Sequence, residues 1–154
     1  MNIEPLDTLE GSGFPACQQL SVFLENRVGQ LLRLTRVLDA EQIRILALSV
    51  EGSVDCAIVR MIVNDPDTAT SLMSDSGFAV ASTEVLVVEL PAGKRGILSV
   101  CAALISGEVN INYTYPILSQ ADRGPCLAIQ VDNLSLAAKV LSHKKFLVLD
   151  QHEL

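Results

Sequence analysis

The residues best suited to catalysis are few and scattered in this chain. Its two histidines, His143 and His152, do not lie near both a nucleophile and a carboxylate in any arrangement that the predicted elements would bring together. No glycine-rich phosphate-binding motif follows a predicted strand. The four cysteines are widely spaced and include no CxxC pair, so we predict no metal site. These patterns favour a protein that is not an enzyme and that requires no cofactor.

An enzyme with an unforeseen site around Cys101, Tyr113 and Tyr115 is the rival interpretation of the same residues. Cys101 lies in a predicted helix, and the two tyrosines are two residues apart in a predicted strand. Side chains with that spacing project from one face of a strand. A buried thiol and an aromatic pair on a sheet face explain these residues better than catalysis does.

The composition of the chain argues against two classes of binding partner, nucleic acids and membranes. The chain has 154 residues, a net charge of -7 and 49% apolar residues, with only 19% charged. The acidic balance opposes nucleic-acid binding, which needs clustered basic residues, and we interpret Lys144-Lys145 as a solvated helix end. No apolar run approaches the roughly 20 residues that span a bilayer, and the acidic N-terminus does not resemble a secretory signal. We therefore expect a cytoplasmic protein that binds neither nucleic acid nor membrane.

The same order of elements is predicted twice along the chain. Apolar positions repeat at an offset of 66 residues, as in Leu38 and Leu104, and later at 68, as in Phe78 and Phe146. The periodicity predicts strand, helix, strand, strand, helix, strand in each copy. The first copy has strands at 19–24, 43–50, 56–63 and 78–83 and helices at 30–40 and 66–76. The second has strands at 85–90, 109–117, 125–131 and 146–150 and helices at 96–106 and 133–142.

This order predicts an α+β fold. It is made of two ferredoxin-like βαββαβ units in tandem, side by side, with an antiparallel sheet and helices on one face. The boundaries we expect are an N-terminal tail at 1–16, a first unit at 17–83, a second unit at 84–150 and a C-terminal tail at 151–154.

Several predicted strands are apolar on both faces, for example 57–63 and 85–88. A sheet with one solvated face should alternate apolar and polar residues. Because the helices can cover only one face, we predict that the other face packs on a second chain, most simply in a homodimer.

Two short segments resemble a known family. The loop Glu25-Asn26-Arg27-Val28-Gly29 follows the first predicted strand, and Val109-Asn110-Ile111 enters the second strand of the second copy. With the order and duplication of elements, they resemble a tandem pair of ACT domains over residues 19–150. The resemblance implies a regulatory protein without a catalytic domain, which binds a small effector, usually an amino acid. It further implies that binding occurs between two units that join into one eight-stranded sheet.

The resemblance also implies which residues contact the ligand. The family's loop asparagine matches Asn26 in the first copy and Ala92 in the second, whereas its strand asparagine matches Asn110 in the second copy and Arg44 in the first. A carboxamide can both donate and accept, which suits a zwitterionic ligand. If the units pack by pseudo-twofold symmetry, Asn26 and Asn110 converge on one site. The expected ligand-binding residues are Asn26, Arg27, Val28, Gly29, Asn110 and Ile111.

The mirror-related position forms a second candidate region. It lacks both amides and contains Arg44, which would suit an acidic ligand. The loop of the second copy departs from the family pattern, because Arg95 stands where the first copy has Gly29. The residues of this region are Arg44, Gly93, Lys94, Arg95 and Gly96.

Two functions follow from the resemblance. The first is a freestanding regulatory protein that binds an amino acid or related small metabolite. The second is a regulatory subunit that binds and controls a separate metabolic enzyme, with little binding of free ligand.

Overall fold

A computed structural model gives the fold, and it describes residues 13–118 and 122–154. Most of the predicted tail at 1–16 and the first half of the turn predicted at 119–124 lie outside the described residues. The elements in chain order are β1 (Cys17–Glu25), α1 (Gln30–Asp39), β2 (Ile45–Gly52), β3 (Cys56–Val63), α2 (Pro66–Asp75), β4 (Ala79–Glu89), α3 (Gly96–Ser106), β5 (Ile111–Pro116), β6 (Cys126–Val131), α4 (Leu134–His143), β7 (Val148–Leu149) and the 3-10 helix η1 (Gln151–Glu153).

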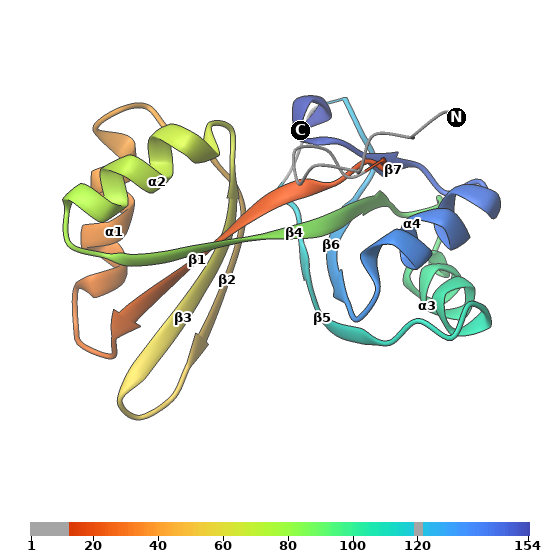
Figure 1. Cartoon of the computed structure of the whole chain (residues 1–154), viewed down its shortest axis with the longest axis horizontal. Helices are drawn as coiled ribbons and strands as arrows, with labels where there is room; N and C mark the ends of the chain where they lie inside the picture. Colours follow the sequence, from red (N-terminus) through yellow and green to blue (C-terminus); the bar gives the residue numbers. More distant parts are fainter. Residues whose placement is uncertain (1–12, 119–121) are drawn as a thin grey trace, which may run out of the picture.

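Both predicted βαββαβ units are present, and they share one long strand. The sheet order is β2-β3-β1-β4-β6-β5, with β7 also paired to β4. The first part of β4 pairs with β1 and completes the first unit, whereas Leu86 to Glu89 pairs with β6 and begins the second. The strands predicted at 78–83 and 85–90 are therefore one element, and the expected boundary after residue 83 falls inside it. Figure 1 shows β4 running from the first unit at the left into the second at the right.

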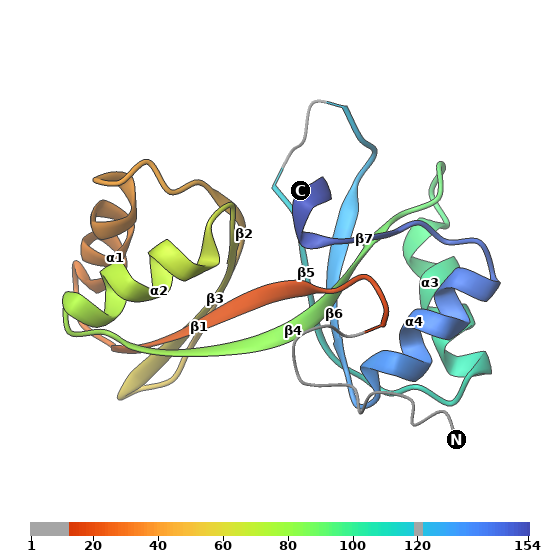
Figure 2. The same cartoon turned by 45° about the horizontal axis from the view of Figure 1, so that its top comes forward.

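Each unit has its own core between its sheet and its two helices. In the first unit, Leu34 and Leu38 of α1 pack on β1 and β3. In the second, Val100 and Leu104 of α3 occupy the matching positions, 66 residues later, and pack on β4 and β6. The pairs of helices lie at the two ends of the molecule with the strands between them, as the view in Figure 2 also shows.

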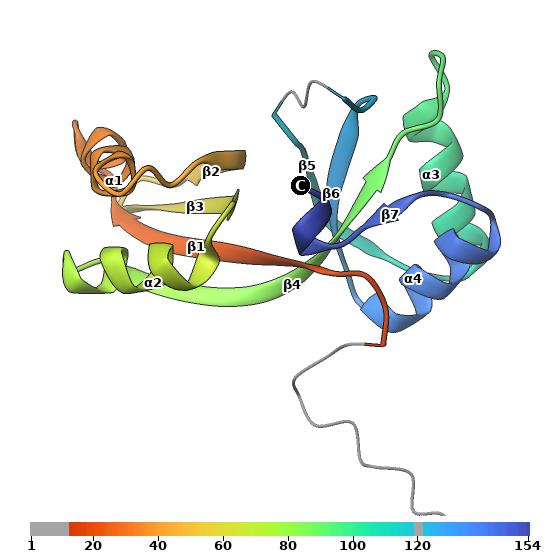
Figure 3. The same cartoon turned by 90° about the horizontal axis from the view of Figure 1, so that it is seen from above.

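A third core joins the two units on the sheet faces away from the helices. It contains Ala47 and Ile62 from the first unit and Val87 and Ala128 from the second, all fully buried. The edge strands β2 and β5 also meet, because the amide of Leu118 donates to the carbonyl of Leu46 at 2.8 Å. Figure 3 shows strands β2 and β3 facing β5 and β6 across this junction.

The third core changes the explanation of the doubly apolar strands. Ile62, Val85 and Val87 are covered on the face away from the helices, as predicted, but by the other unit of the same chain. The pattern therefore reports packing between the units, and it does not require a second chain. The homodimer stays a prediction that needs its own evidence.

A buried polar network lies in the same junction. Gln19 on β1 is fully buried. Its amide nitrogen donates to the hydroxyl of Tyr113 at 2.8 Å, and its oxygen accepts from the hydroxyl of Tyr115 at 2.6 Å. The guanidinium of Arg60 lies 4.1 Å from the ring centre of Tyr113 and forms an ion pair with Glu51 at 2.8 Å. Since buried polar groups must be satisfied, this network favours one arrangement of the two units.

The C-terminal residues predicted as a tail are part of this junction. The side-chain oxygen of Gln151 accepts from the amide of Gln18 at 2.8 Å, and its nitrogen donates to the carbonyl of Val63 at 3.2 Å. Residues 151–153 form η1, which begins with a capping box between Asp150 and Glu153. No helix among the described residues is long and apolar enough to cross a bilayer.

Candidate ligand site

The first candidate loop is tied to the neighbouring hairpin by Asn26. Its side-chain nitrogen donates to the carbonyl of Ser53 at 2.7 Å and is 3.4 Å from that of Val54, both in the turn between β2 and β3. No described residue donates to its side-chain oxygen. The asparagine therefore both holds the loop and leaves an acceptor available to a ligand ammonium group.

The rest of this loop is exposed and ends in a backbone conformation that favours glycine. Arg27 forms an exposed ion pair with Glu25 at 2.7 Å, and Val28 is fully exposed. Gly29 has a φ of 86° and precedes the first helical residue of α1. A side chain would be strained at that φ, so the glycine sets the angle at which the chain enters the helix.

The two helices that follow the candidate loops differ from the other two at their N-termini. Asp65 caps α2 by accepting from the amide of Thr68, and Asn133 caps α4 by accepting from the amide of Leu136. The hydrogen bonds from the hydroxyl and amide of Thr68 also hold the pKa of Asp65 below its usual value. Neither α1 nor α3 has a side-chain cap. The amide of Gln30 at the start of α1 donates to the carbonyl of Arg27 at 3.3 Å, but no side chain caps the amides at the positive end of either helix dipole.

The starts of the second strands have the same backbone arrangement in both units. The amide of Asn110 donates to the side chain of Asp132 at 3.1 Å, and the amide of Arg44 donates to that of Asn64 at 2.8 Å. The amide side chain of Asn110 is exposed and donates to Asn112 at 3.2 Å. Ile111 is half-buried against the core of the second unit, so it supports the position of Asn110.

The loop of the second unit is shaped differently from the first. Its left-handed residue is Gly93, with a φ of 98°, whereas Arg95 has a φ of -102° where the first unit has Gly29. Gly96 is buried, and a Cβ there would lie 2.9 Å from the carbonyl oxygen of Pro91. Lys94 and Arg95 are exposed. A hollow of about 410 Å³ lies beside this loop, and its lining includes Pro91, Ala92, Gly124, Lys145 and Phe146.

Within one chain the structure does not bring Asn26 and Asn110 together. Asn26 lies beyond Phe23, which pairs with Ala79 at the start of β4. Asn110 comes just before β5. Strand β5 pairs with β6, and β6 in turn pairs with β4 only from Leu86 to Glu89. Along β4, Ala79 and Leu86 are seven residues apart, which is roughly 20 Å at the usual rise per residue of a strand. A site that uses both amides would therefore need two chains.

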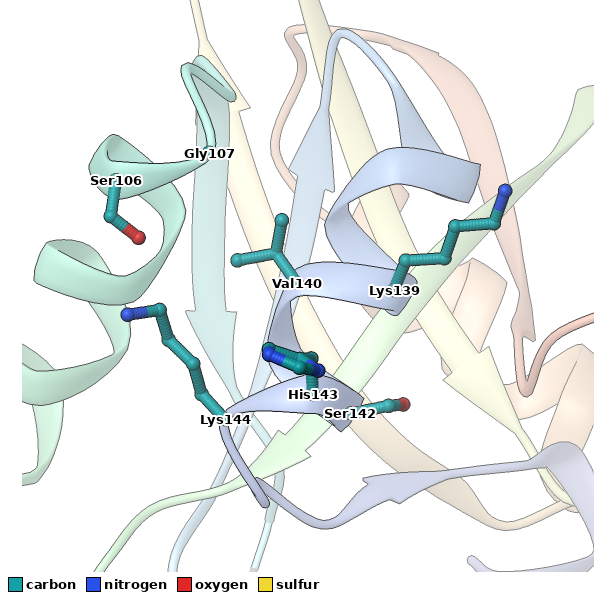
Figure 4. A pocket seen from close by; sticks show the side chains of 7 residues that line it. All are labelled: Ser106, Gly107, Lys139, Val140, Ser142, His143 and Lys144. Atoms are coloured by element: carbon teal, nitrogen blue, oxygen red, sulfur yellow. The ribbon is translucent and has the colours of Figure 1, made fainter.

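A larger hollow lies elsewhere, between the C-terminal ends of α3 and α4. Its volume is about 910 Å³. In Figure 4, Lys144 points across it toward Ser106, whereas Lys139 points away. We predicted no ligand-binding role for these residues. The signal was present, because the matching first-unit residues, 68 positions earlier, are Ser71, Asp75 and Ser76 in place of Lys139, His143 and Lys144.

We do not place the ligand in this larger hollow. Lysine and histidine at a helix C-terminus are explained by the negative end of its dipole. The hollow also lies at the opposite end of α3 from the candidate loop, about 16 Å away for a helix of 11 residues.

Comparison with known proteins identifies the family. The family described as the ACT domain pair matches residues 16–154. The crystal structure of protein BT0572 from Bacteroides thetaiotaomicron is 33% identical, with a TM-score of 0.84, and the match covers 93% of this chain and 100% of that one. The chain therefore belongs to the ACT domain pair family.

More distant structures share the fold. The regulatory subunit of aspartate kinase from Thermus thermophilus, in its ligand-free form, is 10% identical with a TM-score of 0.57, and the match covers 84% of this chain and 92% of that one. The corresponding subunit from Thermus flavus is also 10% identical, with a TM-score of 0.54 and the same coverage. Comparison with curated proteins gives no match.

Proposed function

We propose that this chain is a regulatory protein that binds an amino acid at the loops preceding α1 and α3. The observation that carries the proposal is the contrast in helix caps. The two helices that follow the candidate loops have uncapped N-termini, whereas α2 and α4 are capped by their own side chains. A ligand carboxylate would supply the missing acceptor.

The first unit offers the more complete half of such a site. Asn26 presents a side-chain oxygen for the ligand ammonium group, and Gly29 allows the backbone to approach closely. Arg27 and Val28 flank the site on its exposed side. In the second unit, Asn110 supplies an amide and Ile111 fixes its position. Arg44 and the segment Gly93–Gly96 form the second candidate region, whose positive charge would favour an acidic ligand.

A thermal-shift screen of the twenty amino acids tests the proposal. A ligand at 100 times its dissociation constant adds about 2.7 kcal/mol of stability, which for a chain of this size raises the melting temperature by about 5–10 °C. We expect Asn26→Ala to reduce the shift. Ala92→Asn, which changes the matching position of the second loop, is the control and should leave the shift in place.

Asn110→Ala distinguishes one site from two. Because the two amides are separated in one chain, independent sites predict that each variant removes only part of the response. Complete loss of the response with either variant alone would instead mean that a second chain brings the amides together.

The other candidate function is control of a separate enzyme. It is favoured by the shared fold with a protein described as a regulatory subunit of aspartate kinase. Under this function, the amino-acid screen gives no shift and the tagged chain recovers a metabolic enzyme from cell extract. An amino-acid response that requires Asn26 would argue against it.

A further inference from the structure

Helix α3 exposes a continuous apolar face. Val100, Ala103 and Leu104 are buried in the core of the second unit. On the opposite side, Leu98 is 61% exposed and Ile105 is 73% exposed. Ala102 is also exposed and Cys101 is half-buried between them. Positions 98, 101, 102 and 105 lie on one side of a helix, so they form a single surface, which we call the α3 stripe.

The first unit has no such surface at the matching positions. The residues 66 positions earlier on α1 are Leu32, Thr35, Arg36 and Asp39. The two units share the same fold and the same core positions, so the fold itself does not require apolar residues on this outer face. The α3 stripe is therefore a property of the second unit that calls for its own explanation.

We propose that the α3 stripe packs against the α3 stripe of a second copy of this chain, about a twofold axis between Cys101 and Ala102. The order of side chains is the same read from either end, with a large residue, two small ones and a large one. Antiparallel packing then places Leu98 of each copy against Ile105 of the other. The small residues Cys101 and Ala102 lie at the crossing point, where they let the two helices approach closely.

The charges beside the stripe fit the same axis. Lys94 and Arg95 lie just before α3, and Glu108 lies just after it. In an antiparallel pair, Arg95 of one copy comes next to Glu108 of the other, at the negative end of the partner helix. The matching residues of the first unit are Val28, Gly29 and Gln42, which carry no charge. The apolar stripe and its flanking charges thus occur together in one unit and are absent from the other.

The net charge of the chain limits the surfaces through which two copies can associate. Each chain has a net charge of -7, so two copies repel each other over most of their surfaces. Helix α3 contains no charged residue from Gly96 to Ser106. It is only about 16 Å long. Stable dimers bury about 800 Å² on each partner, more than one short helix offers, so this dimer should dissociate on dilution.

Sedimentation velocity over a dilution series tests the proposal, with exposed leucines at matching positions as variant and control. At high concentration the chain should sediment at twice its mass of 16.5 kDa. Leu98→Glu should shift the dimerisation midpoint to at least tenfold higher concentration. Leu32→Glu, at the equivalent exposed position of α1, should leave it unchanged. A chain that is monomeric throughout, or equal effects of the two variants, would overturn the proposal.

Charge reversal tests the axis itself. Arg95→Glu and Glu108→Arg should each weaken the dimer, and the double variant should restore it. Failure of the double variant to recover would mean that these residues do not face each other.

Oxidation with copper phenanthroline and oxygen gives an independent test, because it joins two Cys101 thiols that meet at the axis. A covalent dimer should form in wild type and Cys56→Ala but not in Cys101→Ala. A covalent dimer that persists in Cys101→Ala would refute the proposed axis. These measurements need no ligand, so they stand or fall separately from amino-acid binding.

Discussion

Replacing Gln19 with methionine should destabilise the chain far more than an ordinary polar-to-apolar exchange. Methionine has a similar length but can neither donate to Tyr113 nor accept from Tyr115. The Tyr115 side chain is only 4% exposed, so its hydroxyl would lose its partner without access to water. Burial raises the pKa of Tyr115, so this hydroxyl remains a donor throughout the pH range of an unfolding experiment.

The magnitude follows from the two short hydrogen bonds. Leaving a buried hydroxyl unsatisfied costs about 1–3 kcal/mol, and the lost bond to Tyr113 adds about 1 kcal/mol. We therefore expect about 3 kcal/mol for Gln19→Met. Tyr115→Phe should cost about 2 kcal/mol, because it leaves the Gln19 oxygen unpaired. The double variant removes both partners, so its cost should be lower than the sum by about 1–2 kcal/mol.

Urea unfolding followed by circular dichroism measures all three variants. A loss of 3 kcal/mol should also lower the melting temperature by about 6–12 °C. Tyr113→Phe is the control, because the Tyr113 ring is only half-buried and water can replace part of its hydrogen bonding. If the two substitutions add to within about 0.5 kcal/mol, Gln19 and Tyr115 are not coupled and the account of the unit junction is wrong.

Two further predictions concern a buried thiol and a close contact between two helices. Burial, with the charges of Asp150 and Glu153, raises the pKa of Cys17 from 9.0 to about 12. The unfolded chain therefore loses this proton at lower pH than the folded chain does. Stability should fall as pH rises from 9 to 12, and urea midpoints across that range should fall less steeply for Cys17→Ala. At Gly107, a Cβ would lie 2.5 Å from a methyl group of Val140, so Gly107→Ala should cost about 1–3 kcal/mol. Adding Val140→Ala should recover part of that loss in the same unfolding assay; a further loss would contradict the proposed overlap.

Local patterns were sufficient to predict the fold of each unit. The repeat marked Leu38 and Leu104 as matching apolar positions of two predicted helices, and both are buried in the cores of their units. The offset of 66 residues is also preserved between these core positions. Such patterns are set by helix and strand geometry within a few residues, which a sequence displays directly.

The arrangement of the two units could not be predicted in the same way. The strands predicted at 78–83 and 85–90 left Glu84 between them, but β4 runs from Ala79 to Glu89 without a break. The junction depends on contacts such as Ala47 with the second unit, and no periodicity reports contacts so distant in the sequence. Placing Asn26 beside Asn110 relied on pseudo-twofold packing of the two units. The shared strand keeps these two residues apart within one chain.

Because the two halves of this chain share strand β4, we expect neither half to fold on its own. Strand β4 is paired along its length, first with β1 and then with β6 and β7. Cutting the backbone between residues 79 and 89 would remove the edge strand of one sheet or an inner strand of the other. A fragment that ends or begins there would expose apolar side chains that are now fully buried, Val85 to Val88 among them. The two units are therefore joined through β4 into one body.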